Sequence, residues 1–298
     1  MFVTNPQSKR HGGVTAAVEH DDTQSLKRTP MRDLPQPTLP LFNLQPLRAP
    51  APAMAPRLNV SWARTEDDVR EAQALRYQVF VVEMGARLAP PKGTPPGLDA
   101  DMFDSFCEHL LVRASTASGR PGPVVGTYRV LTPTAAKRAG GLYSETEFDL
   151  TRLRDQRSRM VELGRSCVHA DHRSGASIML LWGALGEFMQ RNGLDTMIGC
   201  ASVSMRDGGH FAASLWKRLE QTHLAPIDRQ VRPRLPLPVD DLRHNLEVEA
   251  PALIKGYLRC GAKVLGAPAW DPDFNTADLP LMMRLDELPA RYRKHFMS

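Results

Sequence analysis

The sequence predicts an α/β domain, and three observations support this fold class. The run MVELGRSCV at 160–168 reads as a strand, and a basic turn that contains glycine and then an apolar run at helical spacing follow it directly. Apolar residues of that helix recur at steps of three and four, which gives it one face to pack on a sheet. They are Ile178, Leu181, Trp182, Leu185 and Met189. The run LDTMIGCASV at 194–203 reads as the next strand, and 298 residues of ordinary composition suffice for one large core.

The overall composition narrows the classes of function. The formal net charge of +5 favours acidic partners such as carrier proteins or anionic lipid surfaces. The sequence shows no zinc-finger spacing, RNP motif or concentrated basic helix, so we expect no nucleic acid partner. It also contains no apolar run of the roughly 18 residues that suggest a membrane span, and its first residues lack the apolar core of a signal peptide. We therefore expect a cytoplasmic protein.

The chain divides by composition into an arm and a folded domain. Residues 1–57 are rich in proline and alanine and show no periodicity, which predicts a disordered arm, with a membrane or partner tether as the alternative. The folded domain is expected at 58–298. Its first strand is LNVSWAR, and its later part contains helices at 210–223 and 250–261 and strands at 263–270 and 279–285.

Five sequence blocks carry a family resemblance. They are LRYQVF, GTYRVL, GGLYSETEFDL, ELGRSCV and GCAS, in this order along the chain. Together they resemble the ornithine acyl-carrier-protein N-acyltransferases of bacterial ornithine lipid synthesis, a GNAT-like family distantly related to acyl-homoserine-lactone synthases. The resemblance implies a mixed twisted sheet flanked by helices. It also implies transfer of a 3-hydroxyacyl group from acyl carrier protein to the α-amine of L-ornithine, with acyl-phosphopantetheine as co-substrate and no permanently bound cofactor or metal.

The first helix and the loop after it contain candidate substrate-binding residues. Thr65 is a good N-cap for a helix over TEDDVREAQALRYQVFVVEM, since acidic residues follow it in the first turn. Arg76 and Phe80 match the Arg-x-x-x-Phe pair of the family, with a surface arginine beside a core phenylalanine as the alternative. The proline-rich loop that follows ends in Asp101 and Asp104, where paired carboxylates could hold a cationic substrate or could simply be solvated.

The central strands contain the candidate catalytic residues. Arg129 lies in the strand VVGTYRVLTP, and the resemblance associates an arginine here with the active-site network; an interstrand salt bridge is the alternative. Glu162 and Arg165 match the family's Glu-x-x-Arg pattern. Glu162 is the predicted general base, with its pKa raised by partial burial, for the ammonium that must lose a proton before attack; a strand carboxylate paired with arginine is the alternative. Strand alternation puts Arg165 on the opposite face, so a shared site requires a bulge or twist at Gly164.

The turn HRSGAS at 172–177 lies where GNAT enzymes hold a pyrophosphate. The resemblance therefore assigns Arg173, Ser174 and Gly175 to phosphopantetheine binding, because a helix N-terminus favours an anion. Only the glycine fits the GNAT motif cleanly, which favours a carrier-bound phosphopantetheine over coenzyme A. Cys167 and Cys200 lie on the two strands beside this helix, so an acyl-cysteine is conceivable, although direct attack by the amine is the better interpretation because no histidine is placed to activate them.

Two other functions fit the same pattern. An autoinducer synthase would use S-adenosylmethionine and form a lactone. A protein that has kept the fold could hold acyl carrier protein or lipid without turnover. The lipid product of the expected reaction also indicates transient contact with the inner membrane surface.

Overall fold

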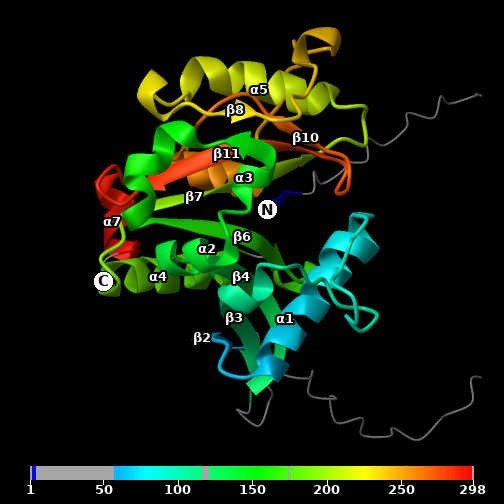
Figure 1. Ribbon diagram of the computed structural model, residues 1–298, viewed down its shortest axis with the longest axis vertical. Coiled ribbons are helices and arrows are strands. Elements are labelled where there is room, and N and C mark those ends of the chain that lie inside the picture. The colour runs from blue at the N-terminus through cyan, green and yellow to red at the C-terminus, as the bar shows by residue number, and fades with distance from the viewer. Residues whose placement is uncertain (1, 5–56, 116–120, 174, 297–298) are drawn as a thin grey trace, which may run out of the picture. The chain divides into compact units, whose positions relative to one another are not determined.

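The structure is a computed structural model that describes residues 2–4, 57–115, 121–173 and 175–296. Figure 1 shows a central sheet with helices packed around it. The strands are β1 (Phe2–Thr4), β2 (Leu58–Trp62), β3 (Glu108–Ser115), β4 (Pro121–Leu131), β5 (Phe148–Asp149), β6 (Met160–Val168), β7 (Thr196–Ser204), β8 (Arg232–Pro233), β9 (Lys263–Val264), β10 (Ala269–Asp271) and β11 (Thr276–Arg284). The α-helices are α1 (Glu66–Tyr77), α2 (Pro133–Ala139), α3 (Ser144–Glu147), α4 (Ala176–Arg191), α5 (His210–Thr222), α6 (Ala252–Arg259) and α7 (Ala290–Phe296).

The main sheet is mixed, as expected. Its strands lie in the order β10-β11-β7-β1-β6-β4-β3-β2, with β9 on β11, while β5 and β8 form a small separate sheet. The pairs among β1, β6 and β7 are parallel and the other pairs are antiparallel. The parallel connection from β6 to β7 runs through α4, the crossover that the sequence predicts.

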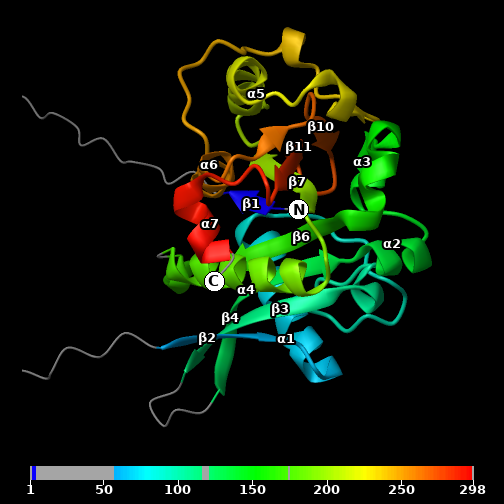
Figure 2. The same ribbon diagram turned by 90° about the vertical axis from the view of Figure 1, so that its left-hand side faces the viewer.

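Helices cover both faces of the sheet, because side chains alternate along each strand. On β3, Leu110 and Val112 belong to the core cluster that includes Leu181 and Leu185 of α4. Leu111, between them, packs in a different cluster with α1. Figure 2 shows α1 and α4 on opposite sides of these strands.

Strands β6 and β7 diverge toward their C-terminal ends. They pair directly only from Met160 to Glu162 on β6, opposite Thr196 to Ile198 on β7. Beyond that point Phe2–Thr4 lies between them as β1, paired with Ser166 on one side and with 201–203 on the other. This differs from the arm expected over 1–57, since composition gives no signal for a pairing with such distant strands. The rest of that arm lies outside the described residues, except Arg57.

Strand β6 contains the predicted irregularity, at Arg165 and not at Gly164. Thr127 pairs with Cys167 and Arg129 with Gly164, so β6 has one residue more than β4 between these pairs. The left-handed residue is Arg165, at φ 49°, and not Gly164. A positive φ is uncommon for arginine and is maintained here by the contacts of its side chain, described below.

Other local differences have clear causes. The strand expected at 263–270 is two short strands, β9 and β10, separated by a segment with Gly266 and Pro268. The short helices α2 and α7 were not predicted. Within the part of the chain that the structure describes, no helix has both the length and the apolar character needed to cross a membrane.

Candidate active site

Strand register brings the central polar residues onto one face of the sheet. Leu131 pairs with Glu162, and Arg129 pairs with Gly164 two residues further along β6. Glu162 in turn pairs with Ile198 of β7, so Cys200 extends from the same face. The loop that ends in Asp104 and the helix α3 lie over this face, as the contacts below show.

Arg76 and Asp104 form a buried, two-pronged ion pair. Nη1 of Arg76 donates to Oδ1 of Asp104 at 2.8 Å and Nη2 donates to Oδ2 at 2.7 Å. The Nε of Arg76 donates to Oδ2 of Asp99 at 3.1 Å, and the carbonyl of Asp99 accepts a further bond from Nη2. Arg76 is fully buried, so it is not the surface arginine of the alternative interpretation.

Two more arginines complete this cluster. Arg129 donates through Nη1 to Oδ1 of Asp101 at 2.6 Å and to Oδ1 of Asp104 at 3.1 Å. Arg165 donates through Nη2 to Oδ2 of Asp101 at 3.1 Å, and its Nε lies 3.5 Å from Oδ2 of Asp99. The left-handed backbone of Arg165 thus brings its side chain to the aspartates that Arg129 and Arg76 also bind. We call these three aspartates and three arginines the ion cluster.

The ion cluster balances its own charge. Burial would raise the pKa of Asp104, but the guanidinium groups of Arg76 and Arg129 hold it far below its usual range. Burial would likewise raise the pKa of Asp101, but Arg129 and Arg165 outweigh it, so this pKa lies below its usual value. A substrate ammonium at Asp101 or Asp104 therefore has to compete with arginines that are already in place.

Aromatic rings surround the ion cluster. Phe80, fully buried, meets Phe274 edge to face with ring centroids 6.1 Å apart. The guanidinium carbon of Arg165 lies 4.7 Å from the centroid of Phe274 and 5.5 Å from that of Tyr143. Phe80 thus contributes packing beside the cluster.

Glu162 is held by the N-terminus of α3. Its Oε2 accepts from the backbone N–H of Tyr143 at 2.6 Å, and its Oε1 accepts from the backbone N–H and the hydroxyl of Ser144 at 2.6 Å and 2.5 Å. These donors fix the carboxylate in one orientation. Burial raises the pKa of Glu162, and the bonds from Ser144 and Tyr143 act in the opposite direction.

A small cavity lies beside Glu162. It has a volume of about 10 Å³, and its lining includes Glu162, Arg129, Gly164, Tyr143 and Cys200. This volume is close to the minimum that one water molecule needs, roughly 10–15 Å³. The site can therefore place a water between the carboxylate and an incoming group.

The segment predicted to bind phosphopantetheine leads into α4, and its arginine already has protein partners. Gly175 has φ 87° and is the N-cap of α4, a conformation that glycine adopts without strain. Arg173 donates to Oε2 of Glu83 at 2.6 Å and to the carbonyl of Val168 at 3.0 Å. Ser174 lies outside the described residues. A phosphate at this turn would displace Glu83 from Arg173.

The cysteines on the central strands are buried thiols. Burial raises the pKa of both Cys167 and Cys200 far above the usual value of a thiol. A thiolate nucleophile is therefore disfavoured at both positions, which supports direct attack.

Sequence reasoning missed several residues of this region. Asp99, fully buried, belongs to the ion cluster; its place two residues before Asp101 in the run DADMFD was the available signal. Glu147 and Asp278 lie near Cys200, with one oxygen of each and the sulfur of Cys200 within 4.8 Å of one another, and Asp271 acts on both carboxylates. They come from α3, β10 and β11, so no sequence spacing could have joined them.

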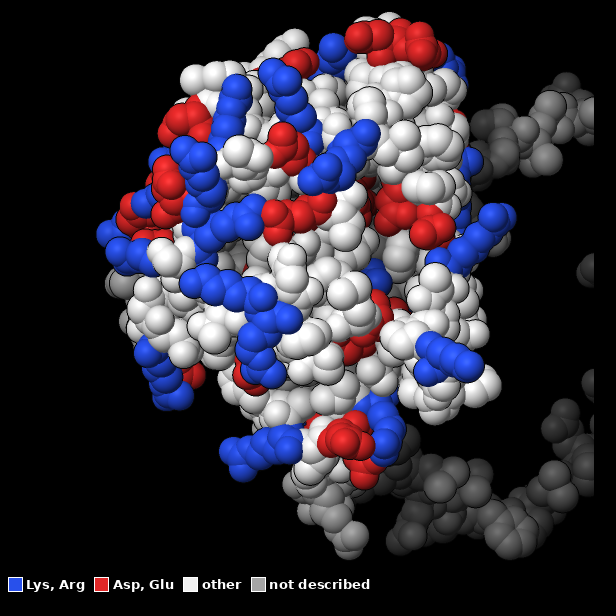
Figure 3. Space-filling view, viewed as in Figure 1, with Lys and Arg blue, Asp and Glu red and all other residues white. Residues whose placement is uncertain are grey.

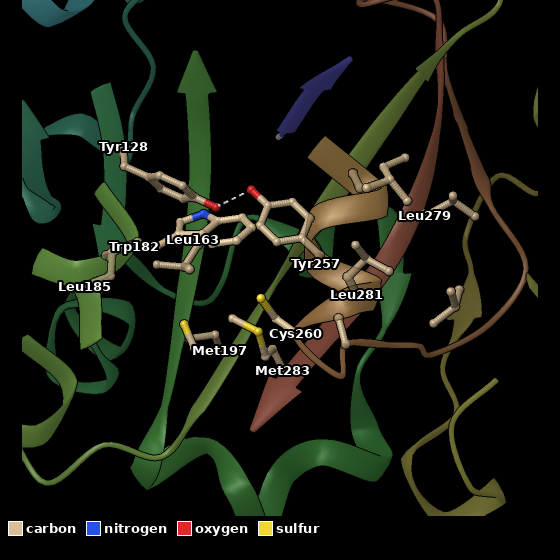
Figure 4. Close-up of a cluster of buried hydrophobic side chains, with 14 of the residues drawn as sticks. Tyr128, Leu163, Trp182, Leu185, Met197, Tyr257, Cys260, Leu279, Leu281 and Met283 are labelled. Atoms are coloured by element: carbon tan, nitrogen blue, oxygen red, sulfur yellow. Dashed lines mark hydrogen bonds between the residues drawn. The ribbon is translucent and has the colours of Figure 1, made fainter. Parts of the chain in front are cut away.

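An apolar cavity lies on the opposite side of β6 and β7. Its volume is about 30 Å³, and its lining includes Leu163, Met197, Gly199 and Met283. Figure 4 shows the rings of Tyr128 and Tyr257 at this place, with their hydroxyl groups 2.8 Å apart.

Comparison with known proteins gives consistent matches. Residues 75–183 match the family model described as an acetyltransferase (GNAT) domain. The chain is 36% identical over 243 residues to the L-ornithine N(alpha)-acyltransferase of Rhodobacter capsulatus, covering 78% of this chain and 92% of that protein. It is 34% identical over 252 residues to the Brucella abortus protein of the same name, covering 80% and 88%. Among solved structures, FeeM, an N-acyl amino acid synthase from uncultured soil microbes, matches at 10% identity with a TM-score of 0.47, covering 82% of this chain and 99% of that one.

Proposed function

The chain belongs to the L-ornithine N(alpha)-acyltransferase family, and we propose that it moves a 3-hydroxyacyl group from acyl carrier protein to the α-amine of L-ornithine, forming lyso-ornithine lipid. Its fold is that of a GNAT-like acyltransferase. The observation that carries the proposal is the 36% identity to a relative of that name along 92% of the relative's length.

Glu162 is the proposed general base. The α-amine of an amino acid arrives as an ammonium and must lose a proton before it can attack a thioester. The raised pKa of Glu162 brings its proton affinity closer to that of the amine, and the cavity beside it can hold one water as a relay. The amine then attacks the thioester carbon, and the phosphopantetheine sulfur leaves and takes up a proton.

The proposed donor site is the opening between β6 and β7. A phosphopantetheine arm carries amide groups, so it can pair with strand edges as β1 does at 201–203. Binding there would replace β1 and bring the thioester toward the face that carries Glu162. The turn at Arg173 and Gly175 then receives the phosphodiester.

The acyl chain is proposed to enter the apolar cavity beside Leu163 and Gly199. The cavity of about 30 Å³ is too small for a long chain as it stands. Met197 and Met283 line it, and methionine side chains adjust their shape readily. The amphiphilic product supports transient contact with the inner membrane; a vesicle flotation assay that finds no bound protein would count against this contact.

Mass spectrometry of the reaction products tests the main proposal. Purified protein is mixed with 3-hydroxyacyl carrier protein and a panel of amines that includes L-ornithine, L-lysine, L-glutamine and S-adenosylmethionine. We expect the mass of acyl-ornithine, and much less of it with Glu162→Gln. An acyl-homoserine lactone would identify an autoinducer synthase. Carrier binding without any acylated amine would identify a binding protein.

A further inference from the structure

A large cavity opens beside the ion cluster. Its volume is about 360 Å³, and its lining includes Asp101 and Arg165 of the ion cluster, Tyr143 and Glu147 around α3, and Asp271 at the end of β10. Figure 3 shows acidic side chains within a hollow on this side of the molecule, with basic side chains around it. The cavity is large enough for an amino acid, and both of its ends carry charged groups.

Glu147 and Asp271 line the cavity, Asp278 lies buried next to Glu147, and these three carboxylates lack a cation. Both side-chain oxygens of Glu147 are buried, and the polar groups beside them, the hydroxyl of Tyr143 and the carboxyl of Asp278, carry no positive charge. Asp278 is fully buried; its Oδ1 accepts from the hydroxyl of Thr276 at 2.9 Å, and neither of its oxygens has a basic partner. Asp271 accepts only backbone N–H groups, from Asp273 and Phe274. In the described parts of the chain, no lysine, arginine or histidine forms a salt bridge with Glu147, Asp271 or Asp278.

This contrasts with the ion cluster next to it. There each aspartate binds at least one arginine, as expected because an unpaired charge away from water is costly. The same chain leaves Glu147 and Asp278 without such a partner a short distance away. Carboxylates arranged in this way would be stabilised by a cation that comes from outside the protein.

The charge state of the carboxylates agrees with this reading. Burial and the neighbouring carboxylates of Asp278 and Asp271 raise the pKa of Glu147 to about 9. Burial and Asp278 raise the pKa of Asp271 to about 6. Without a ligand the group therefore retains a proton, which an entering cation would release.

Contacts link these carboxylates to the proposed base. The hydroxyl of Ser144 donates to Oε1 of Glu162 and lies 3.5 Å from Sγ of Cys200. That sulfur lies within 4.8 Å of a carboxylate oxygen of Glu147 and of Asp278. Tyr143 lines both the large cavity and the small cavity beside Glu162, so the two spaces adjoin at this residue.

We propose that Glu147 and Asp278, assisted by Asp271, bind the side-chain ammonium of the acceptor and so select a diamino acid. The inference rests on the proposed function, in which the α-amine reacts beside Glu162. Ornithine carries its two amines at opposite ends of a short aliphatic chain, which matches the two adjoining spaces.

Substrate analogues test this assignment. We compare kcat/KM for L-ornithine with that for L-norvaline, which has the same carbon chain without the side-chain amine, in wild type, Glu147→Gln and Asp278→Asn. We expect wild type to prefer ornithine by on the order of 10²-fold or more, because norvaline leaves the carboxylates unpaired. Both variants should lose most of this preference through a lower kcat/KM for ornithine, while kcat/KM for norvaline is unchanged or higher.

The outcomes separate the two proposals. If wild type acylates no amine, the proposed function fails. If it acylates ornithine and norvaline equally well, only the selection by these carboxylates fails. An equal fall in kcat/KM for ornithine and for norvaline in the variants would also overturn it, because a purely structural role of these carboxylates has that effect. Glu187→Gln, an exposed carboxylate on α4, is the control and should retain the wild-type preference.

Two further measurements complete the test. Circular dichroism and binding of the acyl carrier identify a variant that fails to fold. In that case Asp271→Asn is used in its place, and we expect it to lose the preference for ornithine as well. A loss of ornithine preference on chelation with EDTA, restored by a divalent metal, would show that the carboxylates and Cys200 hold a metal ion and would overturn the proposal.

Discussion

Arg76 binds Asp104 through two parallel hydrogen bonds of 2.8 Å and 2.7 Å, with both side chains buried beneath the loop that leads to β3. The pair joins α1 to this loop. Because Asp104 also binds Arg129 of β4, the same carboxylate connects the helix to the central sheet. The ion cluster therefore positions the loop over the face of the sheet that carries Glu162.

Asp104→Asn tests this structural role. It leaves buried arginines without their counter-charge, so we expect a loss of about 3–5 kcal/mol in the free energy of unfolding. Urea denaturation measures it. Arg70→Ala is the control on the same helix, because Arg70 forms only exposed pairs with Glu66 and Asp67, worth about 1 kcal/mol or less. Unchanged stability with a raised KM for ornithine would instead indicate that Asp104 binds substrate.

Much of the fold could be predicted from local patterns. The bounds of β6 agree with the run MVELGRSCV, and Thr65 caps α1 in a capping box with Asp68, because these signals lie within a few residues. The helix α2 had signals that were not used: Thr132 as N-cap, a proline at its first position and Gly140 after its end. The place of β1 could not be predicted, since strand pairing across the whole chain leaves no local signal.

The site was predictable only in part, for the same reason. Motif matching found Arg76, Asp101, Asp104 and Arg129, and the structure brings them into one cluster. It gave no means to find Asp278, because a strand near the C-terminus brings that side chain next to α3.

Glu162→Gln should remove the base while keeping the donor site. We expect the rate of acyl transfer to fall by about 10²–10⁴-fold, with carrier binding largely retained. In wild type the rate should rise with pH through the raised pKa of Glu162, because a base must be deprotonated to act. That limb of the pH–rate profile should be absent in the variant. Glu108→Gln, exposed on β3, is the control, and an unchanged rate in Glu162→Gln would exclude the role.

The buried thiols should not carry the acyl group. Burial raises the pKa of Cys167 and Cys200, so little thiolate exists near neutral pH. Intact-mass spectrometry after mixing with the acyl carrier, without an amine, should find no added acyl mass on the protein. Cys167→Ala should transfer at nearly the wild-type rate. A stable acyl adduct on either cysteine would contradict direct attack.

Met283→Ala should change the acyl chain that the enzyme prefers. Met283 is buried and lines the apolar cavity, so its truncation enlarges a space of about 30 Å³. We expect a shift toward longer acyl chains in competition assays, together with a loss of stability of about 2–5 kcal/mol. Met179→Ala, at an exposed position of α4, should change neither. An unaltered chain preference in Met283→Ala would mean that the acyl chain lies elsewhere.

Stability without ligand should fall as pH rises above neutral. The pKa of Glu147 is about 9 in the folded chain, whereas a glutamate in an unfolded chain titrates near 4.3. Between these values the folded state holds a proton that the unfolded state has lost, so each pH unit lowers the free energy of unfolding by up to about 1.4 kcal/mol. Burial lowers the pKa of His109, so this residue makes stability rise with pH. Its effect ends near pH 6.5, the pKa of histidine in an unfolded chain. The window from about pH 7 to 8.5 lies above the titration of His109 and below most of that of unfolded cysteines. Glu162, whose pKa burial also raises, adds to the slope in this window, so the part of the slope that is due to Glu147 is the part that Glu147→Gln removes.

Glu147→Gln should lower this slope, because an amide does not titrate. Urea denaturation at both ends of the window, for wild type and variant, measures the difference. Saturating L-ornithine should stabilise wild type more at the upper end, since less proton has to be released when the ammonium binds. It should stabilise the variant much less at either pH. If the free energy of unfolding of wild type depends on pH as little as that of Glu147→Gln, Glu147 is already ionised in the free protein. The carboxylates then need no cation to become charged.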